Sequence, residues 1–232
     1  TSLSLQAQMD FLELKQQFWE YHKAEMQDSM LYVAVALSEQ GDIYHKKHEA
    51  DSAFIFWEES IKYLKTLEVS TKNFKNEIAD CLNHIAWKYR EEVEYEDALK
   101  ILEESFNIRE RAKNIDKVGL FDSYNRLGVL YDQQFDFKQA KKYQKEAEKI
   151  INELKDAYPQ KYAQFFQNMA VTQIKLNDLD GAHSSLNESK TIWSELIANE
   201  VNDSVRAQYR QKFANNLNIW GWYYDRKKAS HN

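Results

Sequence analysis

A chain of 232 residues with one proline and five glycines has few helix breakers, and its abundance of Leu, Lys, Glu, Gln and Ala favours a nearly all-helical fold. The formal net charge of −6, from 37 acidic and 31 basic residues, is mild for this length and argues against a surface built to bind nucleic acid. The single Cys81 excludes an internal disulfide, and no apolar run is long enough to cross a bilayer, so we expect a soluble protein of the cytoplasm.

The first predicted element is a helix over residues 3–25. Leu5, Met9, Leu12 and Trp19 recur there near helical spacing, without the small residues that mark the rest of the chain. We interpret residues 1–28 as a helix that caps the first of a series of repeated units.

Four helix pairs are predicted over residues 29–200. Their ranges are 29–47 with 50–68, 74–92 with 95–113, 117–134 with 137–157, and 160–176 with 179–199. Short polar residues that can cap the incoming helix mark the turn inside each pair, as at Asn177 and Asp178. Pro159 fits the first turn of a helix, where its missing N–H costs nothing, and is predicted to open the fourth pair.

The last predicted element is a helix over residues 203–226, within a C-terminal segment of residues 201–232. Leu217, Trp220, Gly221 and Tyr224 repeat the pattern of a first helix, but no second helix follows them. Two interpretations stay open: a terminal cap, or the first half of a further pair. Trp222, Tyr223 and Tyr224, which we expect to be exposed, favour a further pair, because a cap presents a polar outer face.

The pairs share a spacing of small residues: a glycine or alanine, an alanine twelve positions later, and a second small residue after seven more. The sets are Gly41, Ala53 and Ser60; Ala86, Ala98 and Ser105; Gly128, Ala140 and Ala147; and Ala170, Ala182 and Ser189. They lie 45, 42 and 42 residues apart. Helices approach to about 8 Å only where the side chains at the crossing are small, so we assign these residues to helix crossings.

Bulky residues accompany each crossing. An apolar residue lies four positions before the first small residue and an aromatic residue three positions after it, as Leu82 and Tyr89 do around Ala86. Both lie on nearly the same helical face as the small residue and are expected to fill the space beside the crossing. In the fourth unit Gln173 stands where the aromatic residue is expected.

The pattern resembles the tetratricopeptide repeat, W-x2-L-G-x2-Y followed by A-x3-F. The residues that carry the resemblance are Tyr124, Leu127, Gly128 and Tyr131 with Ala140, and Leu37, Gly41 and Tyr44 with Ala53 and Trp57. The resemblance covers residues 31–228, in units about eight residues longer than the usual 34 and without their closing proline. Such long units are similar to those of kinesin light chains, Pins-type spindle adaptors and Rap-type peptide receptors. The resemblance implies a single domain, a right-handed α-α superhelix of antiparallel helix pairs whose first helices line a concave groove.

A column of polar residues follows the bulky position of each first helix. It holds Ser38, Asn83, Asn125, Gln167 and Asn218. Because a helix turns about 100° per residue, we expect this column to point away from the core face and towards the groove. A carboxamide can bond both the C=O and the N–H of a peptide, and the resembling families use asparagines in this way. The alternative is that these amides bond neighbouring helices across the stack.

Aromatic and charged residues continue the column. Trp87 and Arg90 follow Asn83, and Trp222 follows Asn218. Aromatic residues with an arginine in a groove are typical anchors for a partner. The alternative for these aromatic residues is packing between repeats. The corresponding residues of the middle units include Val129 and Val171, which predict a less polar floor that favours an apolar side chain of the ligand.

No catalytic or metal-binding motif is found. His45, His48 and Glu49 are close in sequence, but His48 falls in a predicted turn and no third ligand has matching spacing. Cys81 has no sequence signature of a nucleophile and is interpreted as a buried thiol. We expect no enzyme activity, no metal and no cofactor.

The leading functional prediction is a protein–protein interaction module that binds an extended peptide, or a partner's tail, in the concave groove. The predicted peptide-binding residues are Asn83, Trp87, Arg90, Asn125, Gln167, Asn218 and Trp222. Two alternatives remain: a sensor or regulatory domain of a larger signalling protein, and a self-assembling scaffold whose aromatic surface forms a homodimer. No nucleic acid or membrane partner is expected.

Overall fold

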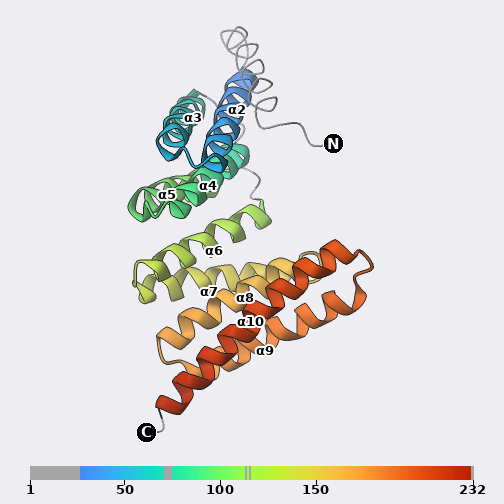
Figure 1. Ribbon diagram of the computed structural model, residues 1–232. Coiled ribbons are helices and arrows are strands. Elements are labelled where there is room, and N and C mark those ends of the chain that lie inside the picture. Colours follow the sequence, from blue (N-terminus) through green and yellow to red (C-terminus); the bar gives the residue numbers. More distant parts are fainter. Residues whose placement is uncertain (1–26, 71–74, 113, 115, 231–232) are drawn as a thin grey trace. The chain divides into compact units, whose positions relative to one another are not determined.

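The computed structural model describes residues 27–70, 75–112, 114 and 116–230, and every regular element in them is an α-helix (Figure 1). The helix predicted over residues 3–25 lies outside the described residues. The described helices begin and end within three residues of the predicted positions. By its contacts the chain divides into two compact units, Thr1–Ser123 and Tyr124–Asn232. That all pairs form a single repeat domain stays a prediction.

Unit 1 contains two helix pairs. Helix α2 (Gln27–Lys46) packs along α3 (Ala50–Ser70), and α4 (Lys75–Glu91) packs along α5 (Tyr95–Glu110). The second pair stacks on the first, because α4 also contacts both α2 and α3. The first part of α6 (Lys117–Gln133) completes the unit.

Unit 2 contains the rest of α6, followed by α7 (Phe137–Leu154), α8 (Pro159–Lys175), α9 (Leu179–Asn199) and α10 (Asp203–Ala229). Helix α8 packs along α9 and contacts α7, and α10 lies beside both α9 and α8 (Figure 1). Pro159 occupies the first turn of α8, as predicted, with Tyr158 at the N-cap.

The predicted small residues lie at the helix crossings. All twelve are buried. A Cβ built on Gly41 would lie 2.3 Å from Trp57 Nε1 of α3, and one built on Gly128 would lie 3.0 Å from Gln144 Cγ of α7. Ser60 and Ser105 also bond across their crossings, donating to the carbonyl oxygens of Ala34 and Ala79 at 2.7 and 2.8 Å. The spacing of small residues therefore sets the distance between paired helices.

The turn inside each pair has one conformation. A residue with positive φ, between 60° and 68°, follows each first helix; these residues are His48, Val93, Phe135 and Asn177. The N–H of the next residue bonds the carbonyl oxygen five positions back, as from Glu94 to Tyr89 at 3.0 Å. This is the Schellman termination of a helix, which usually has glycine at the left-handed position. Asp136 and Asp178 then cap the incoming helix, accepting bonds from Gln139 and Gly181.

A buried arginine that sequence reasoning did not identify lies in unit 1. Arg109 is fully buried in α5 and pairs with Asp80 of α4, with Asp116 3.6 Å from its Nη1. A Cβ built on Gly119 would lie 2.1 Å from the same Nη1, so only glycine leaves room for the guanidinium there. Arg109 thus ties α5 to α4 and to the start of α6.

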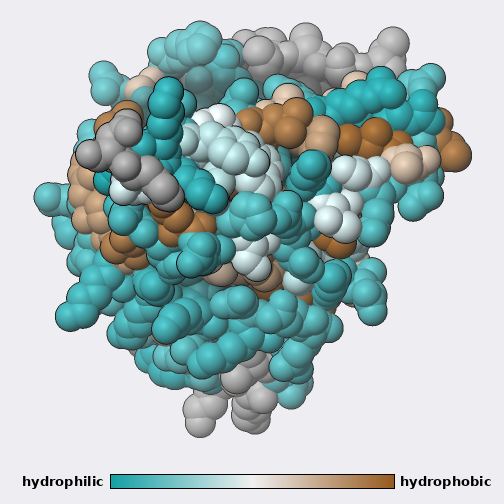
Figure 2. Space-filling model, turned by 90° about the horizontal axis from the view of Figure 1, so that it is seen from below, coloured by the Kyte–Doolittle hydropathy of each residue, from teal (hydrophilic) through white to brown (hydrophobic). Residues whose placement is uncertain are grey.

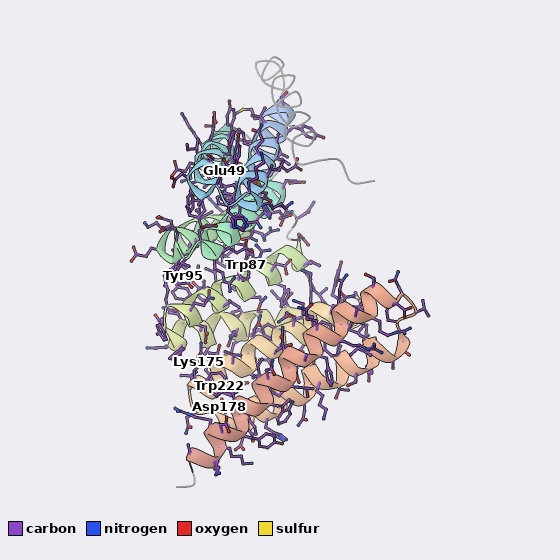
Figure 3. All side chains as sticks on the ribbon, in the orientation of Figure 1. Glu49, Trp87, Tyr95, Lys175, Asp178 and Trp222 are labelled. Carbon is purple, nitrogen blue, oxygen red and sulfur yellow. The ribbon has the colours of Figure 1, made fainter. Side chains whose placement is uncertain are left out.

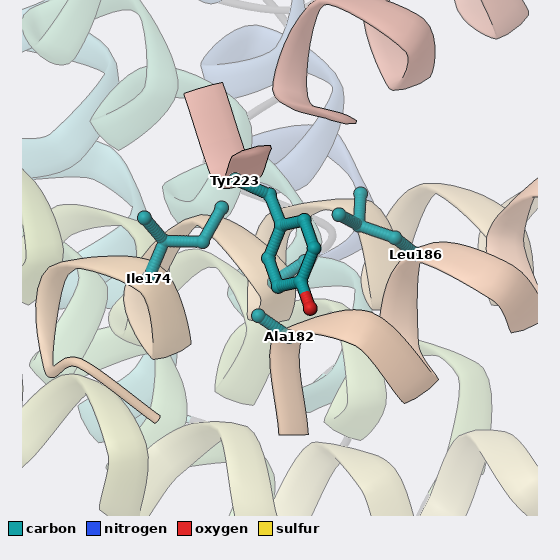
Figure 4. Close-up of a cluster of buried hydrophobic side chains, with 5 residues drawn as sticks. Ile174, Ala182, Leu186 and Tyr223 are labelled. Atoms are coloured by element: carbon teal, nitrogen blue, oxygen red, sulfur yellow. The ribbon is translucent and has the colours of Figure 1, made fainter. Parts of the chain in front are cut away.

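The prediction of which face of the last helix is buried is wrong. The buried residues of α10 are Tyr209, Asn216 and Tyr223; Figure 4 shows the ring of Tyr223 between Ile174 of α8 and Leu186 of α9. The residues predicted to be core, Leu217, Gly221 and Tyr224, are exposed. In the preceding pairs this face packs on a second helix, whereas α10 is the last helix of the described residues.

Candidate functional site

The predicted column of amides does not form an open ladder. Asn83 is 3 % exposed, donates through Nδ2 to Ser123 Oγ at 3.0 Å and accepts at Oδ1 from Ser105 Oγ at 2.8 Å. Gln167 is also 3 % exposed and accepts from Trp193 Nε1 at 3.3 Å. These contacts agree with the alternative interpretation, in which the amides bond neighbouring helices.

The other members of the column differ in exposure. Ser38 is buried, Asn125 is half-buried, and Asn218 is exposed. Asn218 is exposed because no second helix covers that side of α10 in the described residues. The expectation that the whole column faces a groove is therefore corrected, because Asn83 and Gln167 bond side chains of their own second helices, α5 and α9.

An open hollow lies instead one residue further along the first helices of unit 2. Between α6 and α8 is a cavity of about 280 Å³, whose lining includes Val129 and Gln133 of α6 and Asn168, Val171 and Lys175 of α8. Asn168 follows Gln167 directly, so the amide that lines the cavity on α8 lies about 100° around the helix from the predicted one. The predicted apolar floor is present, since Val129 and Val171 both line the cavity.

A buried carboxylate closes one side of this cavity. Asp132 is 7 % exposed, accepts from Thr172 Oγ1 at 2.9 Å and forms an ion pair with Lys175. Thr172 Oγ1 in turn accepts from Gln144 Nε2 at 2.8 Å. A carboxylate held by a hydroxyl and an ammonium group has a fixed position. The cavity therefore combines an apolar floor with an oriented pair of opposite charges, and Figure 3 labels Lys175 at the end of α8.

The predicted anchors of unit 1 lie together on α4. Trp87 and Arg90 are both half-buried, and Arg90 Cζ lies 4.2 Å from the centroid of the Trp87 ring. Such stacking is a cation–π contact and holds both side chains in place. His84, one turn before Trp87, is exposed and lies 2.6 Å from Asp42 of α2. Asp42 of α2 and His84, Trp87 and Arg90 of α4 thus form an aromatic and polar strip on the first helices of unit 1.

Trp222 lies on α10 and is 39 % exposed. It belongs to a set of large exposed apolar residues on this helix that also includes Leu217 and Tyr224. In the view of Figure 2, from below, the surface is mostly hydrophilic and its apolar side chains gather in separate patches. Exposed aromatic residues of this kind are common at protein interfaces.

The histidines and the cysteine that were considered as metal ligands or as a nucleophile lie in contacts or turns that belong to the fold. His45 Nε2 lies 2.9 Å from a carboxylate oxygen of Glu92, and His48 occupies a left-handed turn position. Burial raises the pKa of the Cys81 thiol to about 11, and its Sγ lies 3.9 Å from Ser60 Oγ. Among the residues that the structure describes, no three His, Cys, Asp or Glu side chains gather to hold a metal ion. Their helices include none that is long and apolar enough to span a bilayer.

Comparison with known proteins supports the repeat assignment. Residues 77–153 match the model of the tetratricopeptide repeat family. The crystal structure of BtubC (BKLC) from P. vanneervenii is similar in fold, with a TM-score of 0.73 at 14% sequence identity, over 100% of this chain and 94% of that one. No curated protein matches the sequence. Residues 77–153 therefore match tetratricopeptide repeats, and the chain has an all-α, helical-repeat fold.

Proposed function

We propose that this protein is an interaction module that binds an extended segment of a partner protein along its first helices. Tetratricopeptide repeats support a role in protein–protein interaction in general. The observation that carries the finer proposal is the cavity between α6 and α8, where Val129 and Val171 form an apolar floor beside the Asp132–Lys175 pair. Sites for ligands combine apolar walls with a few fixed polar groups in this way.

The cavity is sized for one side chain of the ligand. About 280 Å³ accommodates a single large apolar side chain, while Asn168, which lines the cavity and accepts at Oδ1 from Gln164, carries an amide Nδ2 that can donate to a peptide backbone. Asn125 and Asn218 remain candidates for such bonds. Trp87 and Arg90 in unit 1, and Trp222 on α10 of unit 2, remain candidates for separate contacts with a partner. The proposed ligand is therefore an extended segment with an apolar anchor residue.

Selection from a random peptide library on the immobilised protein tests the proposal. We expect enriched peptides to share one large apolar residue, and Val171→Asp to weaken their binding about tenfold or more, measured by fluorescence anisotropy. Val201→Asp is the matched control, because Val201 is 88 % exposed outside the cavity. Failure to enrich any peptide, or equal binding to Val171→Asp, contradicts the proposal.

Asn83→Ala is not a clean test of this groove. The substitution removes both buried hydrogen bonds of the amide and leaves Ser105 and Ser123 without that partner. The expected loss of stability is about 1–3 kcal/mol. Reduced ligand binding by that variant would therefore report on the fold as well as on the site.

A further inference from the structure

We propose that a second surface, the open face of α10, docks an acidic amphipathic helix of a partner protein. The open face consists of Ala214, Leu217, Gly221 and Tyr224, with Arg210 and Lys228 at its two ends. All six residues are exposed. They follow one another at intervals of three or four residues, so they form one stripe along the helix. This surface is distinct from the cavity between α6 and α8.

The equivalent stripe is covered in the preceding pairs. On α8 the four central positions are Ala163, Phe166, Ala170 and Gln173, none more than 9 % exposed. On α4 they are Ala79, Leu82, Ala86 and Tyr89, none more than 6 % exposed. In each case a second helix, α9 or α5, packs along the first. The chain therefore shows what fits this stripe: an antiparallel helix with small residues at the crossing.

Gly221 independently indicates that a helix can approach this face closely. Glycine is less favourable than alanine inside a helix, so its presence there usually reflects close packing. Cβ atoms built on Gly41 and Gly128 would lie 2.3 and 3.0 Å from side chains of the paired helix, whereas a Cβ on Gly221 meets no described atom within 4 Å. A glycine with nothing against it is explained if another helix approaches there.

The second helices define the polar chemistry of the docking helix. Ser60 and Ser105 lie seven residues after the crossing alanine and donate to the carbonyl oxygens of Ala34 and Ala79, at the position that Ala214 holds in α10. The amides of Asn83 and Gln167 bond side chains of the second helix, and Asn218 is the exposed equivalent. The docking helix therefore has an alanine at the Gly221 crossing and a serine seven residues later.

Charge indicates an acidic helix. Helix α10 carries six Lys and Arg residues against two Asp. Three of the four second helices have the opposite balance: α3 has four acidic and two basic residues, α5 has five and two, and α9 has three and one, counting Lys and Arg as basic. Arg210 and Lys228 lie at the ends of the open face, where they can pair with carboxylates of an incoming helix.

The test uses a labelled synthetic peptide with the sequence of residues 95–110, which has an alanine and a serine seven residues apart and five acidic residues. Fluorescence anisotropy is expected to show saturable binding to the intact protein. Gly221→Arg should weaken this binding about tenfold or more. The melting temperature should not fall, because the space beside Gly221 is empty and arginine favours helix.

Asn215→Arg is the matched control. Asn215 is exposed, two residues from Leu217 and thus on the other side of α10, so the variant adds the same charge away from the open face. It should bind the peptide like the parent protein. A peptide in which arginine replaces the crossing alanine should not bind. Val171→Asp should also leave peptide binding unchanged, which separates this proposal from that of the cavity.

Three results would overturn the proposal. The first is the absence of saturable binding, and the second is equal affinity for the parent and Gly221→Arg. The third comes from light scattering over a concentration series: a dimer that Gly221→Arg dissociates would assign the open face to a second copy of this chain, not to a partner helix.

Discussion

The two glycines Gly41 and Gly221 occupy equivalent positions in the repeat and should respond in opposite directions to alanine. A Cβ on Gly41 would lie 2.3 Å from Nε1 and 2.4 Å from Cδ1 of Trp57. Trp57 cannot easily move away, because it is fully buried and its indole N–H lies 3.3 Å from Asp42 Oδ1. Overpacking costs about 1–3 kcal/mol, and an overlap this short belongs at the upper end.

The helix propensity of alanine offsets part of this loss, by about 1 kcal/mol, so Gly41→Ala should lower the free energy of unfolding by about 2 kcal/mol. Gly221→Ala has the same gain without the overlap and should raise it by about 0.5–1 kcal/mol. Urea unfolding followed by circular dichroism measures both. At a slope of about 2 kcal/mol/M, the midpoint should fall by about 1 M for Gly41→Ala.

An unchanged midpoint for Gly41→Ala would refute the assignment of Gly41 to a close helix crossing. A lowered midpoint for Gly221→Ala would refute the openness of the α10 face. Because the two variants make the same chemical change, their difference of about 3 kcal/mol isolates the effect of the paired helix.

Three further predictions concern the turns, the thiol and pH. Val93→Gly should stabilise the protein by about 1 kcal/mol in urea unfolding, because Val93 has a φ of 68°, which a β-branched residue tolerates poorly. A loss of stability would contradict the turn conformation. Alkylation of Cys81 by iodoacetamide at pH 8 should be slow until the protein is unfolded, because burial raises the thiol pKa to about 11. Equally rapid labelling of the folded and the unfolded protein would contradict the burial of this thiol. The Lys155 ammonium and the Tyr162 hydroxyl lower the pKa of Glu188 in the folded protein. The ionised carboxylate therefore stabilises the fold above the ordinary glutamate pKa of about 4.3. This stabilisation is lost as the pH falls through the lower pKa of the folded state. The melting temperature of Glu188→Gln should therefore lie below that of the parent at pH 7 and approach it at about pH 3; a gap that does not change with pH would contradict this pairing.

The helix positions and crossings were predictable from sequence because one physical requirement recurs. Close approach of two helices permits only small residues, so Gly128 and Ala140 mark their crossing without any knowledge of the rest of the chain. Assigning the crossings also predicted the apolar floor, because Val129 and Val171 lie on helical faces that the crossings do not use, and both line the cavity.

The direction of the amide column was not predictable in the same way. The first helices α4 and α8 each contact their own second helix and also helices of neighbouring pairs, so their buried arc is wider than the stripe of small residues shows. Asn83 lies within this wider arc, between Ser105 of α5 and Ser123 of α6. A rotation of one residue, about 100°, separates the arc from the open side, and sequence periodicity alone does not fix that boundary.

The face that α10 buries was mispredicted for a related reason. The repeat pattern records which residues suit a paired helix, whereas burial in the structure depends on whether such a helix is present. Tyr223 and Asn216 lie against α8 and α9, whereas Leu217 and Tyr224 carry the pattern but are exposed. Arg109 escaped notice because a buried charge has no periodic signature, and only the structure shows its partner Asp80.

The left-handed turns have a consequence for how far such sequences can diverge. The same backbone bonds hold the turn whether the left-handed residue is His48, Val93, Phe135 or Asn177, so no particular side chain is required for the bend, even where the left-handed φ costs stability. Val93 and Phe135 are 64 % and 78 % exposed. Where main-chain atoms alone specify a bend, substitutions accumulate without altering the path of the chain. Drift of this kind is compatible with a shared fold at 14% identity, and it makes the turn tips permissive positions for attaching probes.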